Sequence, residues 1–215
     1  MQNNVIIFGD SYSTFKGFIP KGYDIYYSDS KESATDVRDV AQTWWYQVCK
    51  EAELNLVLND SWSSSTIGYT GYGNSDCSKS SSFIYRLRQL KENGFFEENK
   101  IDTAFVFGGT NDSWSNAPLG EFKFENITEA DLFCVLPAVF YFLKLLKEIL
   151  PNAKIYCLIN TEIKEEIENC IKKACELYNL IPITFPEIDK AWGHPTIKGM
   201  KTIKENVLKA LSKHE

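Results

Sequence analysis

The stretch VIIFGDS, residues 5–11, decides how the rest of the chain is interpreted. Four apolar residues without polar alternation predict a strand that is covered on both faces, as in a parallel sheet. Gly9 then permits a tight turn, in which the Asp10 carboxylate can bond backbone amides. Ser11 is therefore expected just past the carboxyl end of the first strand. Taken alone, the tripeptide Gly-Asp-Ser is equally consistent with a simple turn that ends a strand.

The rest of the chain alternates short apolar runs with longer segments of helical periodicity. Strands are expected at residues 5–8, 55–58, 103–107, 154–159 and 181–184, and helices at 37–51, 83–91, 130–150, 162–178 and 196–211. Strand–helix alternation predicts βαβ units. We expect an α/β protein, a three-layer α/β/α sandwich with about five parallel strands of the flavodoxin-like type. No repeat or linker interrupts the pattern, so a single domain over residues 1–215 is expected.

The composition excludes several classes of function. The chain is 44% hydrophobic with a net charge of −6 and no basic stripe, so no nucleic-acid partner is expected. No apolar run reaches the roughly 20 residues that span a membrane. No basic and apolar leader is recognisable, which predicts a cytoplasmic protein, or an exported one if a signal peptide has been removed. The six cysteines form no CxxC pair, and the two histidines lack metal-ligand spacing, so reduced thiols and no metal are expected.

Two long irregular stretches, residues 12–36 and 61–82, are rich in aromatic and turn-forming residues. Long loops in a compact domain are usually functional or disordered, and their aromatic content argues against disorder. Both stretches follow strands, and open α/β sheets bind ligands at the carboxyl ends of their strands. A ligand site is therefore expected where these two loops meet.

A serine nucleophile needs a base within hydrogen-bond reach. Only two histidines exist, and His214 is the penultimate residue, so His194 is the candidate imidazole. It follows the last predicted strand in the segment WGHPT, residues 192–196, which places it at the same sheet edge as Ser11. The alternative is a packed or capping histidine without a catalytic role.

Two further segments reach this edge. The segment FGGTND, residues 107–112, offers the Asn111 amide as a donor to a developing oxyanion, with Gly109 leaving room for substrate. The alternative is a glycine turn with an Asx cap. The segment NDSWSSST, residues 59–66, offers backbone amides after the second strand. Four elements that follow four different strands to one edge are what an assembled site requires.

These residues resemble the SGNH hydrolase, or GDSL esterase, superfamily over nearly the whole chain. FGDSYS is similar to its first block, with Ser11 as the nucleophile, and Gly109-Thr110-Asn111-Asp112 to its GxND block, with Asn111 as an oxyanion donor. His194-Pro195 resembles its last block, with His194 as the base. The resemblance implies the α/β/α fold and ester hydrolysis, without one substrate.

The chain departs from that family in two places. The family's second block usually supplies a glycine amide to the oxyanion, and Ser64 stands at that position, or Ser63 if the register differs. A serine amide can serve if the backbone there is open to a side chain. The family usually has Asp three residues before the histidine, where this chain has Ala191. Asp189 is the expected replacement, and the carbonyl of Ala191 is the alternative, which would leave a Ser–His dyad.

The sequence thus predicts a serine esterase with Ser11, His194 and Asp189 as catalytic residues, and with Ser11, Ser64 and Asn111 as oxyanion donors. No cofactor is required. Tyr12, Trp62, Gly109 and Trp114 are the candidate substrate-binding residues. A small-molecule or glycan ester with a short acyl group, such as acetyl on carbohydrate, is favoured, since no apolar lid helix suggests a bulk-lipid lipase. The alternatives are a thioesterase or lysophospholipase with the same site, or a catalytically weak carbohydrate-binding domain. The oligomeric state is left open.

Overall fold

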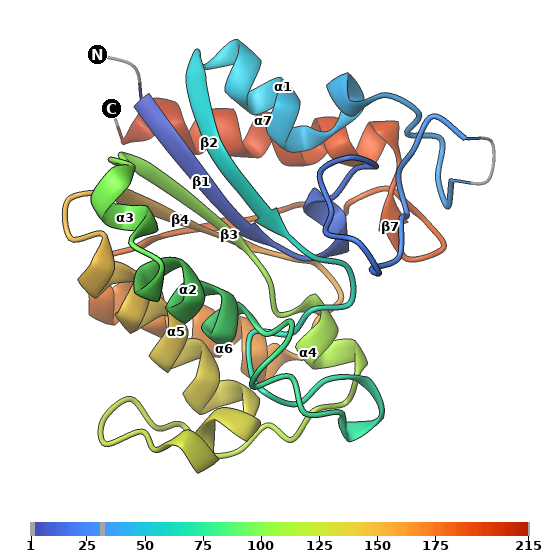
Figure 1. Cartoon of the computed structure of the whole chain (residues 1–215). Coiled ribbons are helices and arrows are strands. Elements are labelled where there is room, and N and C mark those ends of the chain that lie inside the picture. The colour runs from blue at the N-terminus through green and yellow to red at the C-terminus, as the bar shows by residue number, and fades with distance from the viewer. Residues whose placement is uncertain (1–2, 31–32, 215) are drawn as a thin grey trace.

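Five parallel strands form the central sheet of the computed structural model, which describes residues 3–30 and 33–214 (Figure 1). Their order across the sheet is β2-β1-β3-β4-β5. The bounds are β1 Asn3–Gly9, β2 Leu54–Ser61, β3 Thr103–Phe107, β4 Lys154–Ile159 and β5 Ile181–Thr184. This is the strand order of flavodoxin-like folds, and the predicted fold class is confirmed.

Helices cover both faces of the sheet (Figure 1). Helices α1 (Trp44–Glu51) and α7 (Ile197–Lys213) pack on one face, and α2 (Phe83–Glu92), α5 (Val135–Ile149) and α6 (Glu165–Tyr178) pack on the other. The shorter helical elements are α3 (Phe95–Glu98), α4 (Thr110–Trp114) and the 3-10 turns η1 (Ser11–Ser13), η2 (Val40–Gln42), η3 (Tyr72–Asn74) and η4 (Glu129–Phe133). A separate antiparallel hairpin, β6 (Lys190–Ala191) with β7 (His194–Pro195), precedes α7.

The position of strand β1 explains why its sequence shows no polar alternation. Val5 and Ile7 belong to the core under α1 and α7, whereas Ile6 and Phe8 belong to the core under α2, α5 and α6. All four side chains have zero exposure. The strand lies between β2 and β3, so it is buried from above, from below and from both sides.

The predicted helix over residues 37–51 was wrong in its first half. Asp39 caps the short turn η2 in a capping box with Gln42, and Thr43 is extended, with φ −70° and ψ 147°. The α-helix therefore begins only at Trp44. Polar residues that satisfy backbone amides locally interrupt helices in this way.

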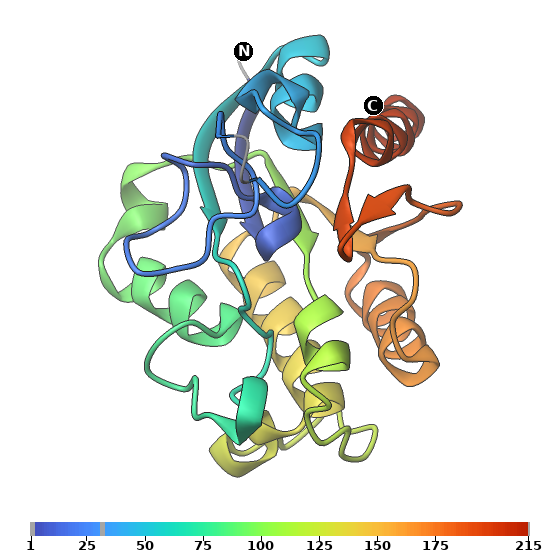
Figure 2. The same ribbon diagram turned by 90° about the vertical axis from the view of Figure 1, so that its right-hand side faces the viewer.

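The carboxyl ends of the strands point to one edge of the molecule, which faces the viewer in Figure 2. Turn η1, the β6–β7 hairpin and the start of α4 meet there (Figure 2). The irregular stretch at residues 12–36 also lies at this edge, except for positions 31 and 32, which are outside the described residues. No helix in the described residues is long and apolar enough to cross a membrane.

Candidate active site

Ser11 and His194 are joined by a hydrogen bond at the carboxyl edge of the sheet. The Ser11 hydroxyl lies 3.1 Å from His194 Nε2, and both residues are buried. Ser11 is the first residue of η1, whose cap is Asp10, because Asp10 Oδ1 accepts the Tyr12 amide at 3.0 Å. The glycine, carboxylate and serine that end β1 therefore build a turn, and the turn presents the serine to the imidazole.

The other imidazole nitrogen is held by the backbone. His194 Nδ1 lies 3.0 Å from the carbonyl oxygen of Trp192, so it donates to that carbonyl when Nε2 accepts from Ser11. The β6–β7 hairpin makes this possible, since Trp192 (φ 51°) and Gly193 (φ 76°) are both left-handed in its turn. Burial lowers the pKa of His194, and the Trp192 carbonyl partly offsets this effect. The imidazole is therefore mainly neutral at neutral pH.

The Asp189 carboxylate points to other partners. It accepts a hydrogen bond from the Thr196 hydroxyl, and Lys198 Nζ lies 3.5 Å away. These contacts lower the pKa of Asp189, with the Thr196 bond as the larger cause. Within the described residues, no hydrogen bond or ion pair joins Asp189 to His194. The acceptor at Nδ1 is the Trp192 carbonyl, one residue beyond the Ala191 carbonyl that the sequence offered as the alternative.

Asn111 is fixed at both ends of its amide. Its Nδ2 donates to the carbonyl oxygen of Ser65 at 3.0 Å, and its Oδ1 accepts from the Tyr72 hydroxyl at 2.9 Å. Since Oδ1 receives the phenol, the amide orientation is defined, and Nδ2 keeps its second hydrogen for another acceptor. Tyr72 was expected only as one of several loop aromatics that could contact substrate, because nothing local in the sequence links it to Asn111 at the start of α4.

Asp112 ties the same two segments together. Its buried carboxylate accepts the amides of Ile67 and Gly68 at 3.0–3.1 Å. Gly109, with φ 94°, starts α4, and a Cβ there would meet Ile167 at 3.3 Å. Gly109 thus serves the turn and the packing against α6. The loop after β2 and the start of α4 form one hydrogen-bonded unit.

Ser64 has the backbone conformation that a glycine would adopt. Its φ is 62°, in the left-handed region, and its amide donates to no acceptor in the described part of the chain. The hydroxyl of neighbouring Ser63 donates instead to the carbonyl oxygen of Asp24 at 2.6 Å. Between the two serines that the register left open, Ser64 is the one in the left-handed region.

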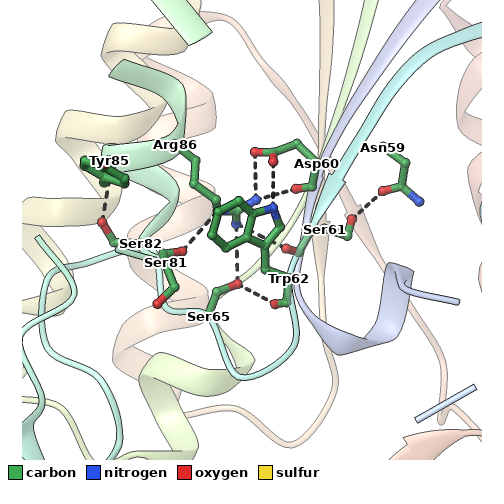
Figure 3. Close-up of polar contacts among 10 residues, drawn as sticks. Asn59, Asp60, Ser61, Trp62, Ser65, Ser81, Ser82, Tyr85 and Arg86 are labelled. Carbon is green, nitrogen blue, oxygen red and sulfur yellow. Dashed lines mark hydrogen bonds and ion pairs between the residues drawn. The ribbon is translucent and has the colours of Figure 1, made fainter. Parts of the chain in front are cut away.

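A buried arginine supports this loop from behind (Figure 3). Arg86 on α2 pairs with the Asp60 carboxylate at 2.7 Å and donates to the Ser81 carbonyl at 3.0 Å and the Gly9 carbonyl at 3.3 Å. Its guanidinium also lies over the Trp62 ring, 5.1 Å from the ring centroid. Sequence reasoning missed Arg86, although its position three residues after Phe83 places it on the apolar side of the helix.

The aromatic candidates have different roles. Tyr12 is fully buried, and its hydroxyl donates to the Gly193 carbonyl at 2.6 Å, so it braces the hairpin that carries His194. Trp62 donates from Nε1 to Asp60 at 2.9 Å and belongs to the Arg86 cluster. Trp114 is 39% exposed and packs on Gly193. Of these three, Trp114 is the one that presents an exposed ring beside the histidine turn.

The carboxyl group of Asp10, next to Ser11 in the chain, is fully buried. Its Oδ2 is buried without a hydrogen-bond partner among the described residues, and burial raises the pKa of Asp10 to about 7. No cluster of three or more histidine, cysteine or acidic side chains suitable for a metal ion occurs in residues 3–30 and 33–214.

A cavity of about 220 Å³ adjoins this group of residues. Ser64 and Tyr72 lie in its wall, and the Tyr72 hydroxyl connects it to Asn111. The complete lining is Gly22, Tyr23, Asp24, Ser63, Ser64, Gly71, Tyr72, Ser75, Cys77 and Ser81. The cavity therefore opens beside the amide donors, between the two long loops.

The fold and the site together define the class of this protein: an ester-bond hydrolase built on an α/β/α sandwich. The chain belongs to the GDSL-like lipase/acylhydrolase family, whose model matches residues 3–211. A comparison with curated proteins gave no match.

Solved structures agree with this assignment. The chain is 40% identical to a protein from Bacteroides ovatus described as a GDSL-like lipase, with a TM-score of 0.89 and 99% of each chain covered. A protein from Bacteroides uniformis with the same description is 39% identical, with a TM-score of 0.88, over 99% of this chain and 96% of that one. An acetyl xylan esterase from Butyrivibrio proteoclasticus shares the fold at 16% identity, with a TM-score of 0.63, over 99% of this chain and 64% of that one.

Proposed function

We propose that the protein is a serine esterase in which Ser11 is the nucleophile and His194 the general base. The observation that carries this proposal is the 3.1 Å contact between the Ser11 hydroxyl and His194 Nε2, with Nδ1 engaged by a backbone carbonyl. A nucleophile in contact with a base that is itself oriented by a third group is the signature of nucleophilic catalysis.

The reaction proceeds in two halves. Ser11 Oγ attacks the ester carbonyl carbon while its proton passes to His194 Nε2. The resulting oxyanion is stabilised by the amides of Ser11 and Ser64 and by Asn111 Nδ2. As the carbon–oxygen bond of the ester breaks, His194 returns the proton to the leaving alcohol. Water then attacks the acyl-enzyme, with His194 as base again, which releases the acid and restores the Ser11 hydroxyl.

A neutral acceptor at Nδ1 stabilises the imidazolium less than a carboxylate does. The Trp192 carbonyl therefore makes this a Ser–His dyad, which we expect to be slower than a triad in comparable surroundings. The Asp189 side chain does not take part in the proposed mechanism and holds the start of α7 through Thr196.

A short acyl group on a carbohydrate is the substrate that we favour. The adjoining cavity of about 220 Å³ is smaller than the roughly 300–1,000 Å³ of sites for drug-sized ligands. Its wall combines the tyrosine rings of Tyr23 and Tyr72 with several serine hydroxyls, which suits a small polar group with an apolar face. An acetyl xylan esterase has the same fold, so the fold is compatible with an acetylated glycan as substrate.

The test is the hydrolysis of p-nitrophenyl acetate, butyrate and octanoate by the wild type, Ser11→Ala and a control variant, Ser212→Ala. Ser212 is an exposed serine near the end of α7. We expect activity that falls with chain length, disappears in Ser11→Ala and is unchanged in Ser212→Ala. Equal rates in wild type and Ser11→Ala, together with no labelling of Ser11 by a fluorophosphonate, would point to a non-catalytic binding domain.

If the short esters are not hydrolysed but Ser11 is labelled, acetylated oligosaccharides and acyl-thioesters are the next substrates. Release of acetate from the oligosaccharide supports the carbohydrate esterase. Turnover of the thioester alone would replace it with the thioesterase.

A further inference from the structure

The long loop between β1 and α1 places an aromatic ring on the imidazole. The ring of Tyr26 is stacked on that of His194, with centroids 3.9 Å apart and an interplanar angle of 19°. This is the closest and most nearly parallel ring pair found among the described residues. A stacked partner restricts rotation of the imidazole out of its plane, and hydrogen bonds at the two nitrogens restrict rotation within it.

Tyr26 is itself held by backbone contacts. Its carbonyl accepts the Ala34 amide at 3.1 Å and the Ser33 hydroxyl at 2.8 Å, and the neighbouring Tyr27 carbonyl accepts the Lys16 amide at 2.9 Å. The loop is also attached to the site on one side, where Asp24 accepts from Ser63. The backbone that carries the stacked ring is therefore held by several hydrogen bonds.

The two phenols that pack against the imidazole carry no charge at neutral pH. Tyr12 of η1 and Tyr27 of the loop pack against His194, with ring centroids 5.8 and 6.2 Å away. Burial raises the pKa of both phenols above the usual value. The Lys190 ammonium lies 5.8 Å from the Tyr12 ring centroid, and Asp10 lies next to Ser11 in the chain. No carboxylate bonds to the imidazole in the described residues, so its orientation depends on Ser11, the Trp192 carbonyl and the Tyr26 ring.

We propose that Tyr26 is a positioning residue, whose stacked ring holds His194 in the orientation that a triad carboxylate would otherwise fix. This rests on the proposed function, in which His194 is the base. The ring matters rather than the hydroxyl, because the stacking uses the face of the aromatic system. Tyr26 acts on kcat through His194 and has little effect on KM.

The test compares Tyr26→Leu, which removes the ring, with Tyr26→Phe, which retains it, using p-nitrophenyl acetate. Phe18→Leu is the matched control, because Phe18 belongs to the same loop but packs on Trp45, away from His194. We expect kcat to fall about tenfold in Tyr26→Leu, since one aromatic pair is worth up to roughly one order of magnitude. Tyr26→Phe restores kcat to within about twofold of the wild type, and KM and the thermal unfolding midpoint stay close to wild type in both.

A second measurement does not depend on turnover. The chain has only two histidines, so the imidazole signals of His194 and His214 are readily assigned by NMR, with His194→Ala as reference. Because burial is the main cause of the lowered pKa of His194, this pKa rises in Tyr26→Leu and is unchanged in Tyr26→Phe and Phe18→Leu.

The outcomes separate the two proposals. If the wild-type protein shows no Ser11-dependent hydrolysis, the proposed function is wrong. The NMR titration then still tests whether Tyr26 stacks on His194. A Tyr26→Leu variant with wild-type kcat and an unshifted His194 pKa overturns the positioning role. Equal losses of kcat in Tyr26→Leu and Tyr26→Phe would assign the effect to the hydroxyl and would also overturn the positioning role of the ring.

Discussion

Replacement of Asp189 by asparagine is the sharpest test of how His194 is oriented. In a Ser-His-Asp triad, replacing the acid by its amide lowers kcat about 10,000-fold, or about 5.4 kcal/mol at 1.36 kcal/mol per tenfold. Here Nδ1 donates to the Trp192 carbonyl at 3.0 Å, a bond that no side-chain substitution removes directly. We therefore expect Asp189→Asn to retain activity within about threefold of the wild type.

The small residual effect has an identified source. The Asp189 carboxylate accepts from the Thr196 hydroxyl and faces Lys198 across 3.5 Å. Thr196 also caps α7, where its hydroxyl accepts the Gly199 amide at 3.2 Å. An asparagine oxygen can still accept from Thr196, so the helix cap survives and only the exposed ion pair with Lys198 is lost.

The assay is kcat and KM for p-nitrophenyl acetate between pH 5 and 9. Lys198→Ala is the matched control, because it removes the same ion pair from the other side. Both variants are expected to show the same small change in kcat, and the pH profile of each is expected to match that of the wild type. A folded Asp189→Asn variant that loses a hundredfold or more in kcat, with Lys198→Ala unaffected, would refute the dyad and restore Asp189 as the third catalytic residue.

Four further predictions follow from the same geometry. Asn111→Ala is expected to lower kcat about 100- to 1,000-fold in the ester assay, since it removes one of the proposed oxyanion donors. Arg86→Met leaves the buried Asp60 carboxylate without its charged partner and is expected to cost about 3–5 kcal/mol in urea unfolding, against less than about 1 kcal/mol for Arg88→Met, whose partner is largely exposed. The acidic limb of kcat/KM is expected below pH 6.5, because the base must be neutral and burial lowers the pKa of His194. The Asp10 pKa is raised from 3.8 to about 7 in the folded protein, so the free energy of unfolding is expected to fall as the pH rises from 3.8 to about 7, and Asp10→Asn should remove this dependence in urea titrations.

Local patterns in the sequence were sufficient to predict the α/β/α architecture. The uninterrupted apolar run of β1 indicated a strand buried on both faces, and both cores do receive its side chains. Since parallel strands end at one edge, the same reasoning placed Ser11, Asn111 and His194 near each other before any distance was known. The predicted helix over residues 37–51 was wrong in its first half because the Asp39 capping box satisfies backbone amides there and interrupts the helix. Hydrophobic periodicity does not reveal such a box.

The orientation of the imidazole was beyond the reach of sequence reasoning. The sequence offered Asp189 or the Ala191 carbonyl as the Nδ1 acceptor, whereas the acceptor is the Trp192 carbonyl. Every residue type possesses a carbonyl, so residue types alone do not indicate which one is used. Tyr26 is remote from His194 in the chain, and no spacing rule connects a loop tyrosine to a ring on the last hairpin. The same holds for Tyr72 and Asn111. These contacts depend on how the long loops fold over the sheet edge.

Two residues near the site, Ser64 and Trp192, have a left-handed backbone although neither is glycine. Ser64, with φ 62°, supplies one of the proposed oxyanion amides, and Trp192, with φ 51°, supplies the Nδ1 acceptor. A glycine would adopt either conformation without the cost of about 1 kcal/mol that a side chain brings. The side chains are retained nevertheless: the Ser64 residue lines the cavity, and Trp192 is 89% exposed on the turn next to His194. A large ring that is almost fully exposed contributes little to folding. In both residues it is therefore the backbone that serves the proposed chemistry.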